Sequence, residues 1–491
     1  MLSSSTATRA VFVAMIVVTT VVVFALASET AGSLRSVVRP LSFGRKTGGR
    51  PAQPLALGAA AANAPGPECA DPYVQDGFLH TTSNVRDTRW LPLYLDDRYA
   101  EPPANAQYPP ARNGDAVVEP TFSTAPPPPA VLGRAPRNWL RDAANYHFML
   151  QDVANHANRG AGTARTLSET DRRLTRDLHW LHNRRLLVLG DSVDRFMIQF
   201  ICEEFGSTSR EAKSEAGTDR IGGKHTSAYC HIPTLNFTVA HWHVAGMYTL
   251  HPDWWWLPHM DTVAFEERWP KFFEPFRDRV AGLDGRNPDL ILFQSGLWDE
   301  RMFRESAISK LDLPRAEAVE TALGREGRPL TWDETTFFKA RMAKFIDLIR
   351  DNFPAVPVMY RSLTTRREAG KADLPTIGMD RVSRHLAAQN GIKVFEWASL
   401  VRGHSTEYLD YLHMGRGSSS YLWGQMVLHY LFSAAGGVQV EGQVVRWPEP
   451  EPRQYVVEGQ GALNVPSLDE IRAHTAAAVP DGAWQGCRAK N

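Results

Sequence analysis

The chain has 491 residues, of which 43% are hydrophobic, so it is long enough to bury a sizeable core. Its 54 basic and 54 acidic residues give a formal net charge of zero. Because a neutral chain has no overall field that attracts a polyanion, we expect no nucleic-acid partner.

The N-terminal region contains a long apolar run without a charge. Residues 1–9 form a short tail, and residues 10–27 are 18 residues without a charge, close to the ~20 that cross a bilayer. We therefore expect a single-pass signal anchor. The run ends in Ala25-Leu26-Ala27, a small-residue pattern typical of a cleavage site, so a signal peptide is the alternative.

The expected orientation is type II, with the catalytic domain in the lumen. One observation argues the other way, because basic residues prefer the cytoplasmic side of a span. Only Arg9 and the amino terminus precede the span, whereas five basic residues follow it, namely Arg35, Arg39, Arg45, Lys46 and Arg50.

Two features favour the secretory pathway. The sequon Asn236-Phe237-Thr238 is a glycosylation acceptor, and the cysteines number four, namely Cys69, Cys202, Cys230 and Cys487. Three pairings are open; one of them closes a local loop between Cys202 and Cys230 and joins the chain ends through Cys69 and Cys487. We expect a Golgi or other secretory-pathway membrane, with secretion as the alternative. Four free thiols in a cytosolic enzyme is the competing interpretation.

The chain divides by composition. Residues 28–136 are rich in Ala, Pro and Gly, with four prolines at 126–129, which predicts a partly disordered stem. Residues 137–440 alternate short apolar runs with helical patterns and form the predicted catalytic domain. Residues 441–491 are a C-terminal extension.

The pattern of the catalytic domain predicts an α/β fold. Buried strands are expected at 186–189, 290–293, 356–360 and 392–395, and helices at 193–205, 332–352, 376–390 and 419–432. Strands separated by helices predict a parallel sheet with helices on both faces, a three-layer α/β/α sandwich of flavodoxin-like type.

Gly190-Asp191-Ser192 stands where the first predicted strand ends and a helix begins. Ligands in parallel sheets bind beyond the carboxyl ends of the strands. A serine in the first turn of a helix lies near unpaired N–H groups that favour developing negative charge, so Ser192 is a candidate nucleophile. The alternative is that Asp191 or Ser192 merely caps the helix.

A serine nucleophile needs a base and an acceptor that orients the base. Asp410 and His413 are three residues apart, just before the last amphipathic helix. On a turn, this spacing lets the carboxylate accept from one imidazole nitrogen while the other faces the serine. An isolated Asp-x-x-His is a weak signal, but the order Ser, Asp, His on one sheet edge is a stronger one.

At this point the chain resembles the SGNH, or GDSL-like, hydrolase superfamily, whose first motif is GDS and whose last is DxxH. It is similar in particular to the PC-esterase branch with the trichome birefringence-like wall polysaccharide O-acetyltransferases and fungal relatives. Residues 293–299 (FQSGLWD) resemble that branch's F-N-T-G-x-W segment, and residues 358–362 (VMYRS) its next strand, which ends on arginine. The resemblance covers about residues 180–435.

The resemblance implies further site residues. Gln294 and Gly296 stand where many family members carry an oxyanion-holding asparagine motif, although G-x-N-D itself is absent, and Gly223, or its neighbour Gly222, is the candidate for the second-motif glycine. Asp191 would brace the nucleophile turn. Arg195 and Arg361 could hold a carboxylate or a sugar hydroxyl, or form surface salt bridges. No cofactor is implied.

Other motifs have alternative interpretations. His241 and His243 could share one face of a strand and bind a metal with His225, His231 or His251, but ordinary hydrogen-bonded histidines are the simpler expectation. Residues 254–256 are three tryptophans, which suit either a carbohydrate platform or packing. Residues 418–420 are serines that suit a helix cap.

The leading hypothesis is a carbohydrate O-acyltransferase that moves an acetyl group through an acyl-serine at Ser192. A secreted carbohydrate acetylesterase and a non-catalytic glycan-binding scaffold are the alternatives. A lumenal transferase with one span would also need a donor on its own side of the membrane, which implies an acyl-donor transporter as a partner.

Overall fold

The computed structural model describes residues 71–75, 77–92, 135–158, 167–212, 227–249, 264–309, 317, 328–367 and 373–435, with four short strands between 438 and 462. The predicted membrane span at 10–27, Cys69, Gly222, Gly223, the tryptophans at 254–256 and Cys487 lie outside these residues. Among the helices that are described, none combines the length and apolar content needed to cross a membrane.

A seven-stranded sheet forms the centre of the domain. Its order is β4 (Arg210–Ala212), β5 (Ser227–Ile232), β6 (Phe237–His243), β3 (Arg185–Gly190), β7 (Leu290–Phe293), β8 (Val358–Arg361) and β9 (Lys393–Phe395). The strands from β6 to β9 are parallel, and all four predicted buried strands are among them.

The other edge of the sheet is antiparallel, which differs from the expected parallel sheet. β5 pairs antiparallel with β6, and β4 pairs antiparallel with β5. The physical reason for the first pairing is the connection, since only the 3-10 turn η7 (Pro233–Leu235) and Asn236 join β5 to β6. A parallel pair would require a crossover of a dozen or more residues.

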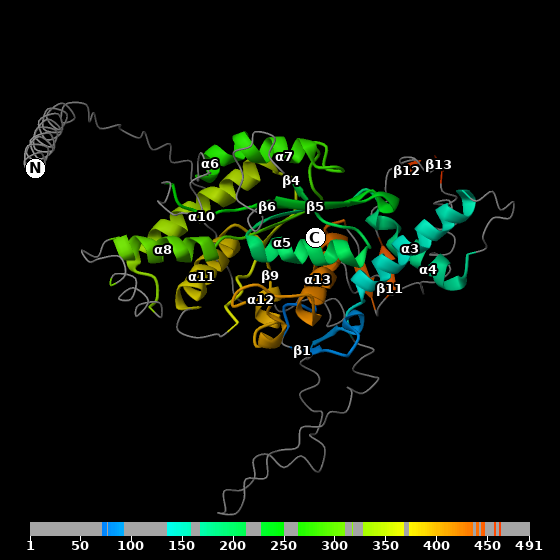
Figure 1. Ribbon diagram of the computed structural model, residues 1–491, viewed down its shortest axis with the longest axis horizontal. Helices are drawn as coiled ribbons and strands as arrows, with labels where there is room; N and C mark the ends of the chain where they lie inside the picture. Colours follow the sequence, from blue (N-terminus) through cyan, green and yellow to red (C-terminus); the bar gives the residue numbers. More distant parts are fainter. Residues whose placement is uncertain are drawn as a thin grey trace, which may run out of the picture. The chain divides into compact units, whose positions relative to one another are not determined.

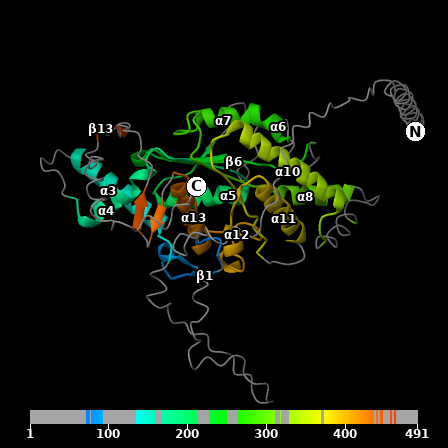
Figure 2. The ribbon, with the colours of Figure 1, turned by 180° about the vertical axis from the view of Figure 1, so that it is seen from behind.

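Helices cover both faces of the sheet. Side chains of β3 alternate, so that Leu186 and Val188 belong to one core and Leu187 and Leu189 to the other. The first core includes residues of α3 (Trp139–Asn158), α4 (Glu169–Leu178), α5 (Ser192–Glu204) and α13 (Ser418–Ala434). The second includes residues of α6 (Phe265–Arg268), the π-turn η8 (Trp269–Phe273), α8 (Leu297–Ser309), α10 (Trp332–Asn352) and α11 (Leu374–Gln389). Figures 1 and 2 show α6, α7 (Glu274–Arg279) and α10 across the sheet from α5 and α13.

Part of the predicted stem packs on this domain. β1 (Gly77–His80) and β2 (Arg89–Pro92) form an antiparallel hairpin with the 3-10 turn η4 (Val85–Asp87) between them. Tyr73 and Trp90 are buried in the same core as α13, and the Gln425 side chain donates to the carbonyl of Thr88 at 2.9 Å. The folded body therefore includes residues well before 137.

The remaining elements are short. They are η6 (His179–Leu181), α12 (Trp397–Leu400), η10 (Ser405–Glu407), and the strands β10 (Val438–Val440), β11 (Gln443–Arg446), β12 (Val456–Val457) and β13 (Gly461–Ala462). The expected Cys202–Cys230 disulfide is confirmed, with 6.0 Å between the Cα atoms, and it links α5 to β5.

The strand order creates a place for a site. Counted from β3, the parallel strands follow the order 2-1-3-4-5, because the chain passes first to β6 on one side of β3 and later to β7 on the other. In open parallel sheets, ligands bind in the crevice at such a reversal, which here falls at the carboxyl ends of β3 and β7. Gly190 ends β3 and Phe293 ends β7, so the segments that follow both strands meet at this crevice.

Candidate active site

Ser192 is held at the junction of β3 and α5. All six residues of β3 are buried, and Asp191 is the N-cap of α5, where its Oδ1 accepts from the N–H of Val193 at 2.9 Å. Ser192 is the first residue of the helix. Gly190 is needed here because a Cβ on it would lie 2.0 Å from Oδ2 of Asp194. Asp191 thus braces the turn, and Ser192 keeps its hydroxyl for another partner.

The partner of that hydroxyl is His413, 221 positions later. Oγ of Ser192 lies 2.7 Å from Nε2 of His413, and Nδ1 of His413 lies 2.8 Å from Oδ2 of Asp410. An ionised carboxylate only accepts, so Nδ1 carries the imidazole proton, and Nε2 accepts from the serine hydroxyl. The structure therefore brings together the three residues that sequence reasoning selected, in the arrangement of a serine nucleophile, a base and an orienting acid.

A small hairpin over 407–415, called the catalytic hairpin below, holds the acid and the base. The N–H of Leu409 donates to the carbonyl of His413, and the N–H of Gly415 to the carbonyl of Glu407, both at 2.7 Å. At its tip, Oδ1 of Asp410 accepts from the N–H groups of Leu412 and His413, also at 2.7 Å. Both carboxylate oxygens of Asp410 are therefore fixed by hydrogen bonds.

These hydrogen bonds set the charge state of Asp410. Partial burial acts to raise its pKa, but hydrogen bonds from the His413 ring and from two backbone N–H groups outweigh burial and lower the pKa below its usual value. Asp410 is thus ionised at neutral pH and able to stabilise an imidazolium. The ring of Phe196, from the first turns of α5, lies 5.0 Å from the His413 ring and covers one side of it.

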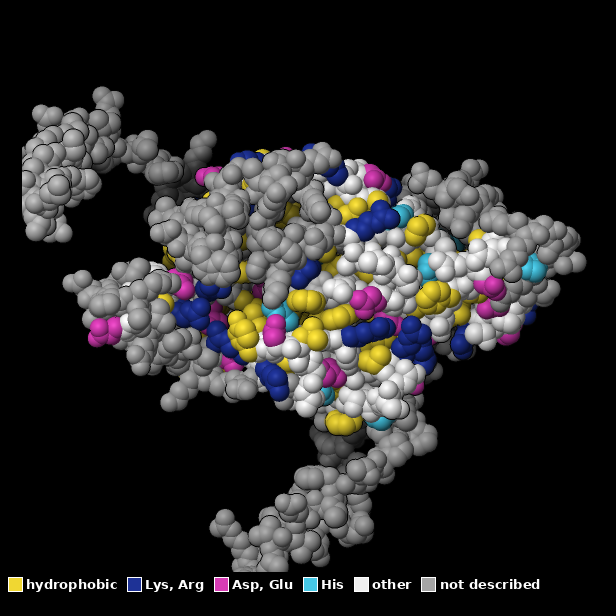
Figure 3. Space-filling model, in the orientation of Figure 1, with side chains coloured by type: hydrophobic (Ala, Val, Ile, Leu, Met, Phe, Trp, Pro, Cys, Tyr) yellow, Lys and Arg dark blue, Asp and Glu magenta, His cyan; other side chains and the backbone are white. Residues whose placement is uncertain are grey.

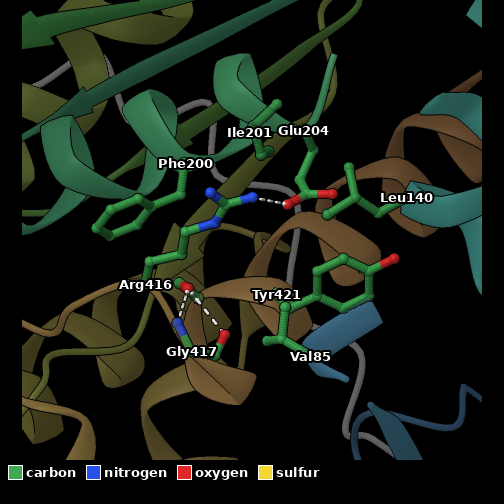
Figure 4. A pocket seen from close by; sticks show the side chains of 9 residues that line it. Val85, Leu140, Phe200, Ile201, Glu204, Arg416, Gly417 and Tyr421 are labelled. Atoms are coloured by element: carbon green, nitrogen blue, oxygen red, sulfur yellow. Dashed lines mark hydrogen bonds and ion pairs between the residues drawn. The ribbon is translucent and has the colours of Figure 1, made fainter. Parts of the chain in front are cut away.

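The far end of α5 is tied to the chain just after His413. Nη2 of Arg416 lies 2.5 Å from Oε1 of Glu204, a buried carboxylate that also accepts from Nε of Arg86 at 2.9 Å. Figure 4 shows Arg416 directed at Glu204 across a cavity of about 10 Å³, the room of about one water. Glu407 caps α13 by accepting from the N–H groups of Ser418 and Ser419. The hairpin is therefore anchored to both helices that flank it.

Arg361 and Gln294 have a different place from the one expected. Arg361 is buried and makes a bidentate pair with Asp194, with Nε to Oδ1 and Nη2 to Oδ2 both at 2.8 Å. The side-chain amide of Gln294 donates to the same Asp194 Oδ2 at 2.8 Å. Both side chains are engaged inside the protein: Gln294 is not directed at an oxyanion, and Arg361 forms a salt bridge that is buried rather than on the surface.

These residues form a buried polar layer, defined here as Asp191, Asp194, Gln294 and Arg361. Burial raises the pKa of Asp191, and the neighbouring Asp194 carboxylate adds to this, while Arg361 acts against it. The charge of Arg361 compensates that of Asp194, and both side chains are buried. The layer joins the ends of β7 and β8 to the first turn of α5, and it thereby fixes the turn that carries Ser192.

The other predicted positions are dispersed. Gly296 directly precedes α8 and packs on Leu363, since a Cβ there would lie 2.4 Å from Cδ1 of Leu363. Arg195 stacks 4.8 Å over the ring of Phe196. Asn236 follows β5 in a left-handed conformation, and its Nδ2 donates to Asn183 at 2.7 Å. Gly223 lies outside the described residues.

Sequence reasoning missed Gly246, which follows β6 beside the end of β3. Its φ of +107° is one that L side chains rarely adopt, and a Cβ would meet the ring of Tyr248 at 2.5 Å. A glycine in the turn after a buried strand would have indicated this position. The sequence, however, offered 241–243 only as a possible strand, so the turn that follows it was not predicted.

The two histidines of β6 are buried. Nε2 of His241 lies 3.0 Å from the carbonyl oxygen of Gly190, and burial lowers the pKa of His241 to about 4, which keeps it neutral. Within the described ranges, no group of three or more His, Cys, Asp or Glu side chains could hold a metal ion. His231 is bonded to Thr238, and His225 and His251 are outside the described residues.

No protein-family model matches the chain, and no curated protein matches it. Among solved structures, a protein assigned as a GDSL-like lipase from Parabacteroides merdae is 12% identical, with a TM-score of 0.29, over 52% of this chain and 96% of that one. A GDSL-like lipase from Bacteroides thetaiotaomicron is 12% identical, with a TM-score of 0.27, over 59% of this chain and 98% of the other.

A carbohydrate esterase family 2 enzyme with a carbohydrate binding domain, from Myceliophthora fergusii, is also 12% identical. Its TM-score is 0.25, over 52% of this chain and 67% of that chain. Likenesses at this level do not establish a shared fold or function, so any assignment depends on the residues of the chain itself.

Proposed function

We propose that the protein is a serine esterase or O-acyltransferase of the SGNH type that acts on carbohydrate, with acetyl as the acyl group. The observation that carries the proposal is the chain of contacts from Ser192 through His413 to Asp410, at 2.7 and 2.8 Å. The GDS and DxxH motifs that supply these residues add the resemblance to the superfamily.

The first half-reaction follows from this geometry. Oγ of Ser192 attacks the acyl carbonyl carbon while its proton passes to Nε2 of His413, and Asp410 stabilises the resulting imidazolium. As the tetrahedral intermediate collapses, the carbon–oxygen bond to the leaving alkoxide breaks, and His413 returns the proton to that oxygen. The products are a free hydroxyl and an acyl-serine.

The second half-reaction separates the two activities. His413 takes a proton from an incoming hydroxyl, whose oxygen attacks the acyl carbon of the acyl-serine. The bond from that carbon to Oγ of Ser192 then breaks, and His413 returns the proton to Oγ. A sugar hydroxyl completes transfer, and water completes hydrolysis. The triad serves both equally. Transfer is supported by the resemblance to polysaccharide O-acetyltransferases, and a secreted carbohydrate acetylesterase is the alternative that uses the same residues.

The oxyanion requires hydrogen-bond donors, and the side-chain amide of Gln294 is not one of them because it is engaged with Asp194. Within the part of the chain that the structure describes, the backbone N–H groups of Ser192 and Gly296 make no hydrogen bond. Each follows the end of a strand that borders the crevice. We assign these two N–H groups as the donors to the oxyanion.

The cellular location is part of the proposal. The Cys202–Cys230 disulfide suits an oxidising compartment, and the sequon at Asn236 suits one where glycans are added. We propose a Golgi or other secretory-pathway membrane with the catalytic domain in the lumen, or secretion if the N-terminal segment is cleaved. In the transferase case, a separate transporter would supply the acyl donor.

The deciding experiment uses the full-length protein and its Ser192→Ala variant. With p-nitrophenyl acetate, and with acetylated and bare oligosaccharides, the substitution should lower kcat by on the order of 10⁶-fold. A fluorophosphonate probe should label the native protein at Ser192, and mass spectrometry should find the trapped acyl group there. If the native protein binds glycans yet shows neither labelling nor turnover, it is a non-catalytic scaffold and the proposal is wrong.

A further inference from the structure

A second concave region lies next to the catalytic hairpin and has no part in the triad. It is a groove of about 450 Å³, within the range of ordinary ligand sites. Its walls come from residues 73–75, the loop after β8, the outer face of α11, the end of β9, and α12. Figures 1 and 2 both show α11 and α12 on the same side of the domain as β1. We call this region the α11–α12 groove.

The charges of the groove are unevenly satisfied. Arg384 holds both carboxylates, with Nε 2.6 Å from Asp380 and Nη1 and Nη2 2.6 and 2.8 Å from Glu396. Arg381 and Arg402 also line the groove and are exposed, and neither side chain makes an ion pair or hydrogen bond with any described residue. The three arginines of the groove outnumber its two carboxylates, Asp380 and Glu396, so Arg381 and Arg402 leave a surplus of positive charge for an anionic ligand.

The rest of the lining suits a sugar chain rather than a bare anion. Val74 is 62% exposed, and Leu400 is half-buried beside it in the groove, so apolar surface is available to the C–H faces of sugar rings. The Ser399 side chain and the Gln75 amide add polar groups that can bond to hydroxyls. Polar, apolar and cationic surface therefore alternate within one groove.

The same loop serves the groove and the active site. Leu363 and Thr365 line the groove, and the carbonyl of Thr365 accepts from Oη of Tyr408 in the catalytic hairpin at 2.8 Å. The N–H of Arg367 donates to the carbonyl of Tyr411, next to Asp410, at 2.9 Å. On the other side, Leu363 packs on Gly296. The loop after β8 therefore connects the groove with the hairpin that carries Asp410 and His413.

We infer that the α11–α12 groove binds an acidic segment of the glycan chain that is acylated or deacylated at Ser192, with Arg381 and Arg402 contacting its anionic groups. This inference rests on the proposed function for the choice of a glycan. The anionic groups are carboxylates of uronic acids or sulfate esters, since either matches a guanidinium. The groove then selects among polymers, whereas the triad supplies the chemistry.

The first test measures binding without turnover. Full-length Ser192→Ala protein is titrated calorimetrically with an oligogalacturonide, with dextran sulfate and with a neutral xylo-oligosaccharide. Arg381→Gln with Arg402→Gln should weaken binding of one acidic probe about 10-fold at low salt, and which probe responds identifies the anion. Equal affinity in the double variant, or an equal loss for the neutral probe, would overturn the inference.

The second test keeps Ser192. In the double variant, KM for an acetylated acidic oligosaccharide should rise about 10-fold with kcat unchanged, and p-nitrophenyl acetate turnover should stay at the native level. Arg173→Gln on α4, which also removes an exposed guanidinium without an ion pair among the described residues, is the matched control and should change neither. An unchanged KM, or the same change in the control, would refute the proposed role of the groove in glycan binding.

The two hypotheses fail separately. Absence of small-ester turnover in the native protein would refute the proposed function. The calorimetric test on Ser192→Ala would still decide whether the groove binds an acidic glycan. Native turnover with no effect of Arg381 and Arg402 on either probe or KM would refute the groove alone.

Discussion

Ser192 stands between two charged regions that are built differently. In the catalytic hairpin, the side chains of Asp410 and His413 are 44% and 15% exposed. In the buried polar layer, those of Asp194 and Arg361 are 0% and 1% exposed. The hairpin pair is oriented by backbone hydrogen bonds within a few residues, whereas the buried pair joins segments 167 positions apart.

The difference shows how charge can serve either chemistry or architecture at one site. A pair that is open to solvent gains little stability but can exchange protons with a substrate. A buried pair does not exchange protons with a substrate, yet removal of one partner leaves an uncompensated buried charge. Substitutions in the two regions should therefore separate activity from stability.

The largest effect is expected for Asp410→Asn, and it should fall on activity. Asparagine has only one acceptor oxygen, and if that oxygen accepts from the N–H groups of Leu412 and His413, the amide NH₂ faces Nδ1 of His413 and imposes the wrong imidazole tautomer. We therefore expect kcat to fall roughly 10⁴-fold. Because Asp410 is exposed, the free energy of unfolding should change by about 1 kcal/mol or less. Turnover of p-nitrophenyl acetate and urea unfolding measure the two quantities. A variant that keeps its turnover, or that loses several kcal/mol of stability, would remove the contrast with the buried layer.

The sequence could predict one of these regions and not the other. Ser192, Asp410 and His413 stand in motifs whose chemistry needs those residue types, and a strand followed at once by a helix locates Ser192 at the sheet edge. Arg361 was visible only as an arginine at the end of a strand. Its partner Asp194 is adjacent only after the sheet forms, so the sequence could not exclude a substrate-binding role.

The fold shows the same division between local and long-range information. Continuous apolar runs predicted β3, β7, β8 and β9, and helical periodicity predicted α5, α10, α11 and α13. β6 was considered only as a possible strand at 241–243; His241 and His243 are polar by type, yet both are buried in the structure. The helices α3, α4 and α8 are rich in charged or alanine residues, and their apolar faces are recognisable only against the core that they cover.

The next largest effect is expected for Arg361→Leu, and it should fall on stability. Asp194 would remain buried opposite an apolar side chain, which should cost roughly 3–5 kcal/mol of unfolding free energy in urea. A double variant in which Asp194→Leu accompanies Arg361→Leu should recover part of this loss, because no charge is left buried. Arg172→Leu breaks the exposed pair with Glu169 and should cost no more than about 1 kcal/mol. If Arg361→Leu and Arg172→Leu lowered the unfolding free energy equally, the buried polar layer would not stabilise the turn that carries Ser192.

The smallest effect concerns the pH dependence of stability and another buried carboxylate, Asp299 on α8. Its two oxygens accept from the N–H of Met247 and from the hydroxyl of Ser295, both at 2.6 Å. Burial outweighs these hydrogen bonds and raises the pKa of Asp299 to about 6. Between its ordinary value near 4 and this folded value, the native protein binds more protons at Asp299 than the unfolded chain does.

Stability from Asp299 should therefore fall as pH rises from about 4 to about 6, by on the order of 3 kcal/mol at most. Asp410 has the opposite sign, since its lowered pKa makes its contribution disappear only as pH falls below its usual value. Urea unfolding across this range should show a shallower pH dependence in Asp299→Asn. The amide can still accept from Met247, and the hydroxyl of Ser295 can turn to accept from the amide. An identical slope in the variant would show that Asp299 is already ionised throughout the range, and that burial does not control its charge.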